Sequence, residues 1–221
     1  MNTKRRLLSL FWVAGMVIVL LLSATTGALA ERGDHAALGG GQVLPPQAKP
    51  HGYSLMDAAA ATAYFNTGPR TPADLPGDFP FQILYLTADN TFSVKTGTML
   101  YVPVITSDNR DALYWEFPDV TDPAAVSAYY FDPEQLGAEF IRIVVDGNVN
   151  ELGPEYAIGV EMPQPRPSEG VSDYTVVAAF LTPLTKGVHT VVIAARLSGT
   201  FILNAFGGVY EFEIPYTVVV Q

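Results

Sequence analysis

The segment from Phe140 to Leu152 constrains the fold more than any other part of the sequence. Phe140 to Val145 reads FIRIVV, Asp146-Gly147 follows, and Asn148 to Leu152 continues beyond it. Asp-Gly readily adopts the positive φ angles of a two-residue type I′ turn, and β-branched residues favour strands on either side. We therefore expect a β-hairpin whose turn is Asp146-Gly147.

Further runs rich in β-branched and aromatic residues predict more strands, bounded by Gly, Pro and Ser. They cover residues 82–87, 91–95, 98–106, 174–181, 188–197 and 210–220. Pro103 and Pro215 lie inside two of these runs, and because proline cannot donate to a ladder, each must occupy a sheet edge, a bulge or the start of a strand. The chain shows no alternation of strands with helices and no internal repeat. This pattern favours a mainly β fold, an antiparallel β-sandwich with open edges.

Residues 1–30 have the composition of a secretion signal. Basic residues at positions 4–6 precede a nearly apolar stretch from Leu7 to Leu22, and the segment ends in Ala28-Leu29-Ala30, the small-x-small pattern of a signal-peptidase site. We expect cleavage after Ala30 and a secreted or extracytoplasmic protein. Retention of the apolar stretch as an anchor is the alternative, and it would be the chain's contact with a membrane.

The residues after the signal divide into three parts. Residues 31–50 are rich in Gly and Pro and are expected to form a flexible spacer. Residues 51–80 predict a short helix and a proline-rich lead-in, because Ser54 and Asp57 have the spacing of a capping box before an alanine-rich run. Residues 81–221 are expected to form the β-sandwich domain, with an insert at 107–137 in which short helices begin at Asp122-Pro123 and at Asp132-Pro133.

The C-terminal part resembles the last strands of bacterial immunoglobulin-like domains of secreted and cell-surface proteins. The residues that carry the resemblance are Leu184-Thr185-Lys186-Gly187-Val188-His189-Thr190-Val191, the long strand from Tyr210 to Val220, and an opening with Phe92, Val94, Gly97 and Thr98. The resemblance extends over about 130 residues as a pattern and implies an immunoglobulin-like sandwich. It also implies that His189 stands where related domains have the tyrosine of a tyrosine corner, and that the role is adhesive, spacing or ligand-binding.

Composition excludes several classes of function. The chain has no cysteine, which excludes disulfides, thiolate metal sites and a thiol nucleophile. Its net charge of −10 disfavours nucleic acid as a partner. The three histidines, His35, His51 and His189, have no metal-ligand spacing, and no nucleophile elbow or phosphate-binding loop is present.

Acidic residues in the insert offer two kinds of chemistry. The candidate ligands of a Ca²⁺ ion are Asp108, Asp111, Asp119 and Asp122, although their spacing does not match an EF-hand and a solvated surface is the simpler interpretation. A carboxylate pair for glycoside hydrolysis could come from Glu116, Asp119, Glu134 or Glu139.

Aromatic residues in the insert offer a candidate ligand-binding surface, because flat rings on loops stack against sugars. These residues are Tyr114, Trp115, Phe117, Tyr129 and Tyr130. Burial in the core is the simpler reading of such rings.

Together these observations predict an exported, non-catalytic module that acts as a surface or secreted interaction domain. Its fold is expected to be an immunoglobulin-like antiparallel β-sandwich with a short N-terminal helix and a partly helical insert. Its expected partner is a surface polymer or a protein, and no cofactor is expected other than calcium. Carbohydrate or small-ligand binding through the insert is one alternative, and a carboxylate-pair glycoside hydrolase is another.

Overall fold

The structure is a computed structural model that describes residues 40–68, 70–113, 115–166 and 170–221. The signal at 1–30, the first part of the expected spacer and Tyr114 lie outside the described residues. The helices are α1 (Leu55–Thr67), α2 (Pro123–Phe131) and α3 (Thr200–Phe206). The strands are β1 (Gln82–Ile83), β2 (Thr91–Val94), β3 (Leu100–Asp108), β4 (Ala138–Val145), β5 (Asn148–Glu151), β6 (Ala157–Arg166), β7 (Val171–Leu181), β8 (Gly187–Leu197) and β9 (Tyr210–Val220).

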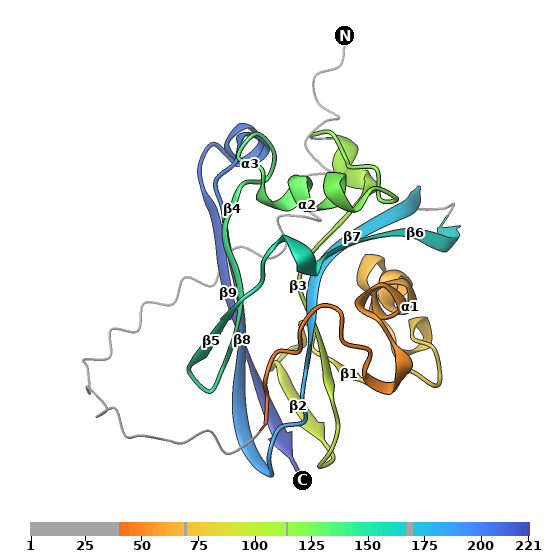
Figure 1. Ribbon diagram of the computed structural model, residues 1–221, viewed down its shortest axis with the longest axis vertical. Coiled ribbons are helices and arrows are strands. Elements are labelled where there is room, and N and C mark those ends of the chain that lie inside the picture. The colour runs from red at the N-terminus through yellow and green to blue at the C-terminus, as the bar shows by residue number, and fades with distance from the viewer. Residues whose placement is uncertain (1–39, 69, 114, 167–169) are drawn as a thin grey trace, which may run out of the picture. The chain divides into compact units, whose positions relative to one another are not determined.

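The fold is mainly β, with two sheets and three helices in the described part of the chain (Figure 1). One sheet has the order β1-β3-β7-β6 and the other has the order β2-β9-β8-β4-β5. Neighbouring strands are antiparallel except for two short contacts, in which β1 runs parallel to β3 and β2 runs parallel to β9. None of the helices in this part of the chain has the length and apolarity to cross a lipid bilayer.

The hairpin indicated by Asp146-Gly147 is present as β4 and β5, whose pairing begins at Val145 and Asn148. Asp146 and Gly147 have φ angles of 48° and 85°, as the two central residues of a type I′ turn require. The expected C-terminal strands are also present. β8 and β9 pair without interruption from Gly187 opposite Val220 to Leu197 opposite Tyr210.

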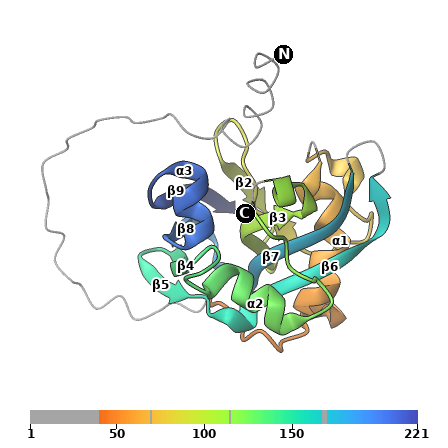
Figure 2. The ribbon, with the colours of Figure 1, turned by 90° about the horizontal axis from the view of Figure 1, so that it is seen from above.

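The two sheets share one apolar core. β7 is buried along most of its length, because the second sheet covers one of its faces and α1 covers the other. Alanines at positions 58, 59 and 63 are fully buried and let α1 lie close against the sheet. Viewed from above, β6 runs between α1 on one side and α2 on the other (Figure 2).

The helix α1 begins as its sequence indicates. The Ser54 hydroxyl accepts a hydrogen bond from the Asp57 backbone N–H at 3.1 Å, and the Asp57 carboxylate accepts one from the Ser54 backbone N–H at 2.8 Å. This pair is the predicted capping box, and the hydrogen bonds lower the pKa of Asp57.

Residues 41–44, which belong to the expected flexible spacer, are hydrogen-bonded to the end of β7. Gly41 N–H donates to the Thr182 carbonyl at 3.2 Å, and Leu44 N–H donates to the Phe180 carbonyl at 2.8 Å, so this segment runs beside the end of β7. Gly41 has a φ of 72°, and a Cβ there would lie 2.6 Å from the Leu184 side chain. Gly41, which was expected to belong to a flexible spacer, is therefore required by tight packing.

Two other local expectations need correction or refinement. No helix forms at Asp132-Pro133, because residues 132–135 make a turn that pairs with the start of α3 through hydrogen bonds such as Phe201 N–H to the Gln135 carbonyl at 3.0 Å. Pro103 lies at a register shift between β3 and β7, as a bulge proline should. Pro215 lies beyond the point where β2 stops pairing with β9, which leaves that edge of β9 open.

Candidate functional site

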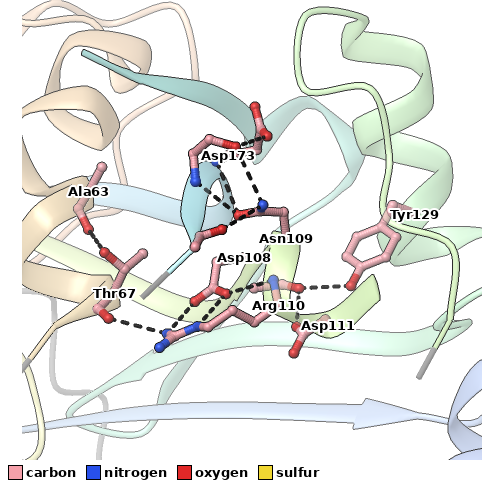
Figure 3. Close-up of polar contacts among 11 residues, drawn as sticks. Ala63, Thr67, Asp108, Asn109, Arg110, Asp111, Tyr129 and Asp173 are labelled. Carbon is pink, nitrogen blue, oxygen red and sulfur yellow. Dashed lines mark hydrogen bonds and ion pairs between the residues drawn. The ribbon is translucent and has the colours of Figure 1, made fainter. Parts of the chain in front are cut away.

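The turn that follows β3 ties three segments together (Figure 3). Arg110 donates to both oxygens of Asp108, at 2.8 Å from Nε and 2.6 Å from Nη2, and Nη2 also donates to the Thr67 carbonyl at the end of α1. Asn109 Oδ1 accepts from the backbone N–H groups of Ser172 at 3.0 Å and Asp173 at 3.3 Å. This polar turn therefore fixes β3, α1 and the start of β7 relative to one another.

A second network runs inward from the same turn. Ser107 Oγ donates to the Asp111 carboxylate, and it also lies 2.7 Å from the hydroxyl of Tyr129. Trp115 Nε1 donates to that hydroxyl at 2.8 Å. Burial raises the pKa of Asp111, and the hydrogen bond from Ser107 offsets part of the rise. These groups satisfy one another inside the protein.

Among the residues that the structure describes, the aromatic residues of the insert do not form an exposed platform. Tyr129 and Tyr130 are fully buried, and the Tyr130 hydroxyl lies 2.8 Å from Thr175 Oγ1. Trp115 is half-buried and stacks on Phe201 with ring centroids 6.1 Å apart. Tyr129 and Tyr130 are therefore core residues, which corrects their assignment to a ligand surface.

Phe117 is half-buried as well, and its ring meets that of Tyr129 edge to face at 5.6 Å. Tyr114, the remaining member of the expected set, lies outside the described residues. The positions of the described aromatic residues therefore do not support sugar binding through their rings.

The four aspartates proposed as calcium ligands serve separate local roles. Asp108 pairs with Arg110 and Asp111 bonds to Ser107, as described above. Asp119 accepts from the backbone N–H of Thr121 at 2.9 Å, and Asp122 caps α2 by accepting from the Ala124 N–H at 2.9 Å. Among the residues that the structure describes, no three carboxylates or histidines are grouped as a metal would require.

The carboxylates considered for glycoside hydrolysis lie on the surface. They are Glu116, Asp119, Glu134 and Glu139, and all are exposed. Glu139 accepts a hydrogen bond from Arg196 Nε at 2.7 Å. None of the four lines the hollow described next.

A hollow of about 470 Å³ lies along β6 between α1 and α2, and we call it the β6 groove. This volume is within the usual range of ligand pockets. Its α1 wall contains Met56 and Ala60, its α2 wall contains Val120, Thr121, Pro123 and Ser127, and its floor contains Pro154, Glu155 and residues 157–161. The sequence contained no local signal for this groove, because its parts come from three distant segments.

The register of β6 explains how the groove is built. Tyr174 faces α1, because its hydroxyl accepts a hydrogen bond from Asn66 at 2.8 Å, whereas Thr175 faces Tyr130 on α2. Val160 lies opposite Tyr174 and Gly159 lies opposite Thr175, and residues opposite each other share a face. The two helices therefore cover the two faces of β6 and leave its outer edge between them.

The edge of β6 is unpaired. β6 is the last strand of its sheet, and no strand of the described chain pairs with its outer side. The C-terminal half of β6 contains prolines at positions 163 and 165, whereas residues 157–161 contain neither proline nor lysine. Of these residues Ala157, Gly159 and Val160 are buried, and the accessible ones are Ile158 and the charged Glu161. An edge without a pairing strand is a template for an additional strand.

His189 forms a corner at the start of β8. Its Nε2 lies 2.8 Å from the Thr185 carbonyl oxygen, and its Nδ1 lies 2.7 Å from Asp146 Oδ2 in the hairpin turn. Both partners are acceptors, so the two nitrogens donate together only when the ring is protonated. Burial acts to lower the pKa of His189, but these two hydrogen bonds raise it above its ordinary value.

Comparison with known proteins adds little. No protein-family model matches the chain, and no curated protein does. Among solved structures, the chain is similar to the solution structure of Amebosin, with 14% identity over 64% of this chain and 99% of that chain, at a TM-score of 0.26. At that score the likeness carries no argument about fold or function.

Proposed function

We propose that the protein is an exported, non-catalytic binding module with an immunoglobulin-like β-sandwich, and that it holds an extended segment of a partner protein along β6. Export rests on the sequence of residues 1–30, with its basic start, apolar stretch and Ala28-Leu29-Ala30. The remaining parts rest on the strand order, the His189 corner and the β6 groove.

The strand order supports the immunoglobulin-like assignment. Such domains place strands A, B, E and D in one sheet and C, F and G in the other, and variable-type domains add C′ beside C. If β3 is strand B and later strands are lettered in chain order, β3-β7-β6 corresponds to B-E-D and β9-β8-β4-β5 corresponds to G-F-C-C′. The short strands β1 and β2 then share the place of strand A, one in each sheet.

His189 supports the same assignment. A tyrosine near the start of strand F commonly bonds back to the backbone a few residues upstream. His189 lies near the start of β8, the strand lettered F, and bonds to the backbone of Thr185. Without cysteine, the two sheets are held by packing and not by the usual disulfide.

The single observation that carries the binding function is the open edge of β6 at the floor of a walled groove. A partner segment that adds as a strand gains backbone hydrogen bonds from the edge and contacts from both walls. The exposed apolar residues of α3 and the turn after it, Leu203, Phe206 and Val209, offer apolar area but do not line the β6 groove.

A random-peptide display selection on the chain tests this function. Peptides enriched by the chain should lose binding to Ala60→Trp, whose indole fills the groove from the α1 wall. Ala61→Trp is the matched control, because Ala61 is the next residue of α1, has similar exposure and does not line the groove. Failure to enrich any peptide, or enriched peptides that bind both variants equally, would contradict the proposal.

A further inference from the structure

The charges around the β6 groove have one sign. Glu155 and Glu161 lie among its lining residues, and no Lys, Arg or His does. Asp119 and Asp122 flank the wall residues at 120 and 121, and both are exposed. On the opposite wall, the exposed Asp57 follows Met56 and lies near the cation of Lys49, which contributes to lowering its pKa. The potential at the groove is therefore negative, in a chain whose net charge is already −10.

The groove also has apolar parts on both walls. Met56 and Ala60 form one wall, and Val120 and Pro123 form part of the other. Successive side chains of an added strand would point alternately toward the two walls. A segment that fits would therefore have small or branched apolar side chains at its centre, and its ends would reach Glu155 and Glu161.

We propose that the partner segment is an extended peptide with an apolar, β-favouring centre and Lys or Arg at its ends, and that it pairs with the backbone of residues 157–161. This inference rests on the proposed function and adds the chemical class of the ligand. Charge complementarity selects this class, since acidic ends would meet like charges at both ends of the groove.

A second copy of this chain is the competing occupant. Two copies that paired through β6 would bring their own Glu155 and Glu161 side chains to the same edge, where like charges oppose association. Sedimentation of the chain should therefore show a monomer. A dimer that Ala60→Trp dissociates and Ala61→Trp does not would overturn the proposal in favour of self-association.

The test uses fluorescence anisotropy with three labelled peptides that differ only at their ends. The first is acetyl-Lys-Val-Thr-Val-Thr-Val-Lys-amide, and the others carry Gln or Glu in place of both lysines. We expect the Lys peptide to bind about tenfold more tightly than the Gln peptide at low salt, about threefold for each exposed ion pair, and the Glu peptide to bind most weakly. Added salt should reduce the difference.

A double substitution locates the effect. Glu155→Gln with Glu161→Gln should weaken the Lys peptide by the same factor and leave the Gln peptide unchanged. Glu116→Gln with Glu134→Gln is the matched control, because it removes two exposed carboxylates that do not line the groove. If the Lys and Gln peptides bind equally, the charge inference is wrong while the proposed function stands. If none of the three peptides binds the folded chain, the charge inference fails. The display selection then decides the proposed function, which stands if an enriched peptide binds the chain and not Ala60→Trp.

Backbone pairing has its own test. A Lys peptide N-methylated at alternate amides loses the donors that one edge of a strand presents, and the complementary N-methylation pattern removes those of the other edge. One of the two patterns should abolish binding and the other should be tolerated. Equal binding of both would overturn strand addition.

Discussion

Replacing Gly159 by alanine should destabilise the fold, because β6 has no room for a side chain at that position. A Cβ there would lie 2.3 Å from the Val120 carbonyl oxygen, 2.9 Å from the Val120 Cα and 2.7 Å from Val126 Cγ2. Two of these atoms belong to the backbone and cannot rotate away. Overpacking costs about 1–3 kcal/mol, and the reduced entropy of the unfolded chain returns about 0.4–1 kcal/mol. We expect a net loss of about 2 kcal/mol.

Urea unfolding followed by far-UV circular dichroism measures this loss, and a thermal scan should show the transition about 4–8 °C lower. Gly208→Ala is the control, because a Cβ at Gly208 meets nothing within 4 Å and its φ is not positive. That variant should be as stable as the original chain or slightly more stable. Equal midpoints for Gly159→Ala and Gly208→Ala would refute the packing argument.

Three further substitutions test the hydrogen bonds described above. Because the pKa of His189 is raised, its protonated pair with Asp146 stabilises the fold fully below about pH 6.5, and this stabilisation is lost as the pH rises through the folded-state pKa. Asp146→Asn should flatten this pH dependence of stability in urea titrations. An unchanged profile would contradict the assignment. Burial raises the pKa of Asp111, so Asp111→Asn should be more stable than the original chain at pH 7. The difference in stability should disappear near pH 4. Thermal scans in which the difference does not change with pH would count against this prediction. Ser54→Ala removes the cap of α1 and should cost about 1 kcal/mol in urea unfolding; a change below about 0.3 kcal/mol would mean that the cap is dispensable.

Elements with a strong local signal could be predicted from the sequence. Asp146-Gly147 specifies its own turn, because few other residue pairs adopt two consecutive positive φ angles. Ser54 and Asp57 specify the start of α1 by bonding to each other's backbone. Asp122 specifies the start of α2 by accepting from the Ala124 N–H, and Pro123 favours the first helical position. In each case the residues that determine the structure are neighbours in sequence.

β6 and α3 could not be predicted in this way. β6 contains Gly159 and two prolines, which argue against a strand, and it forms because β7 pairs with it and Val120 packs against Gly159. The N-cap residue of α3 is Gly199, which has no side chain to cap the helix. Hydrogen bonds to the turn at 132–137 hold the start of this helix. Both depend on partners that lie far away in the chain.

The aromatic pair in the insert was misassigned for a related reason. On an exposed helix, adjacent residues such as Tyr129 and Tyr130 would point in different directions, so at least one would meet solvent. Here α2 lies between β7 on one side and, on the other, the end of β3 with Ser107 and the loop with Trp115, so both rings are covered. The sequence alone does not indicate that both sides of α2 are covered.

The other sheet edges show why the open part of β6 matters. β1 is two residues long, and β5 carries Asn148, Asn150 and Glu151, so neither offers a long apolar edge. The open part of β9 contains Glu211, Glu213 and Pro215, which discourage pairing. Natural sheets use such devices because an unguarded edge invites aggregation. Residues 157–161 carry one such device, the charge of Glu161, and they lie between two walls that restrict access to a single extended segment. An unpaired edge between two walls limits promiscuous sheet growth without blocking the edge by proline, which is an arrangement that selective strand addition can use.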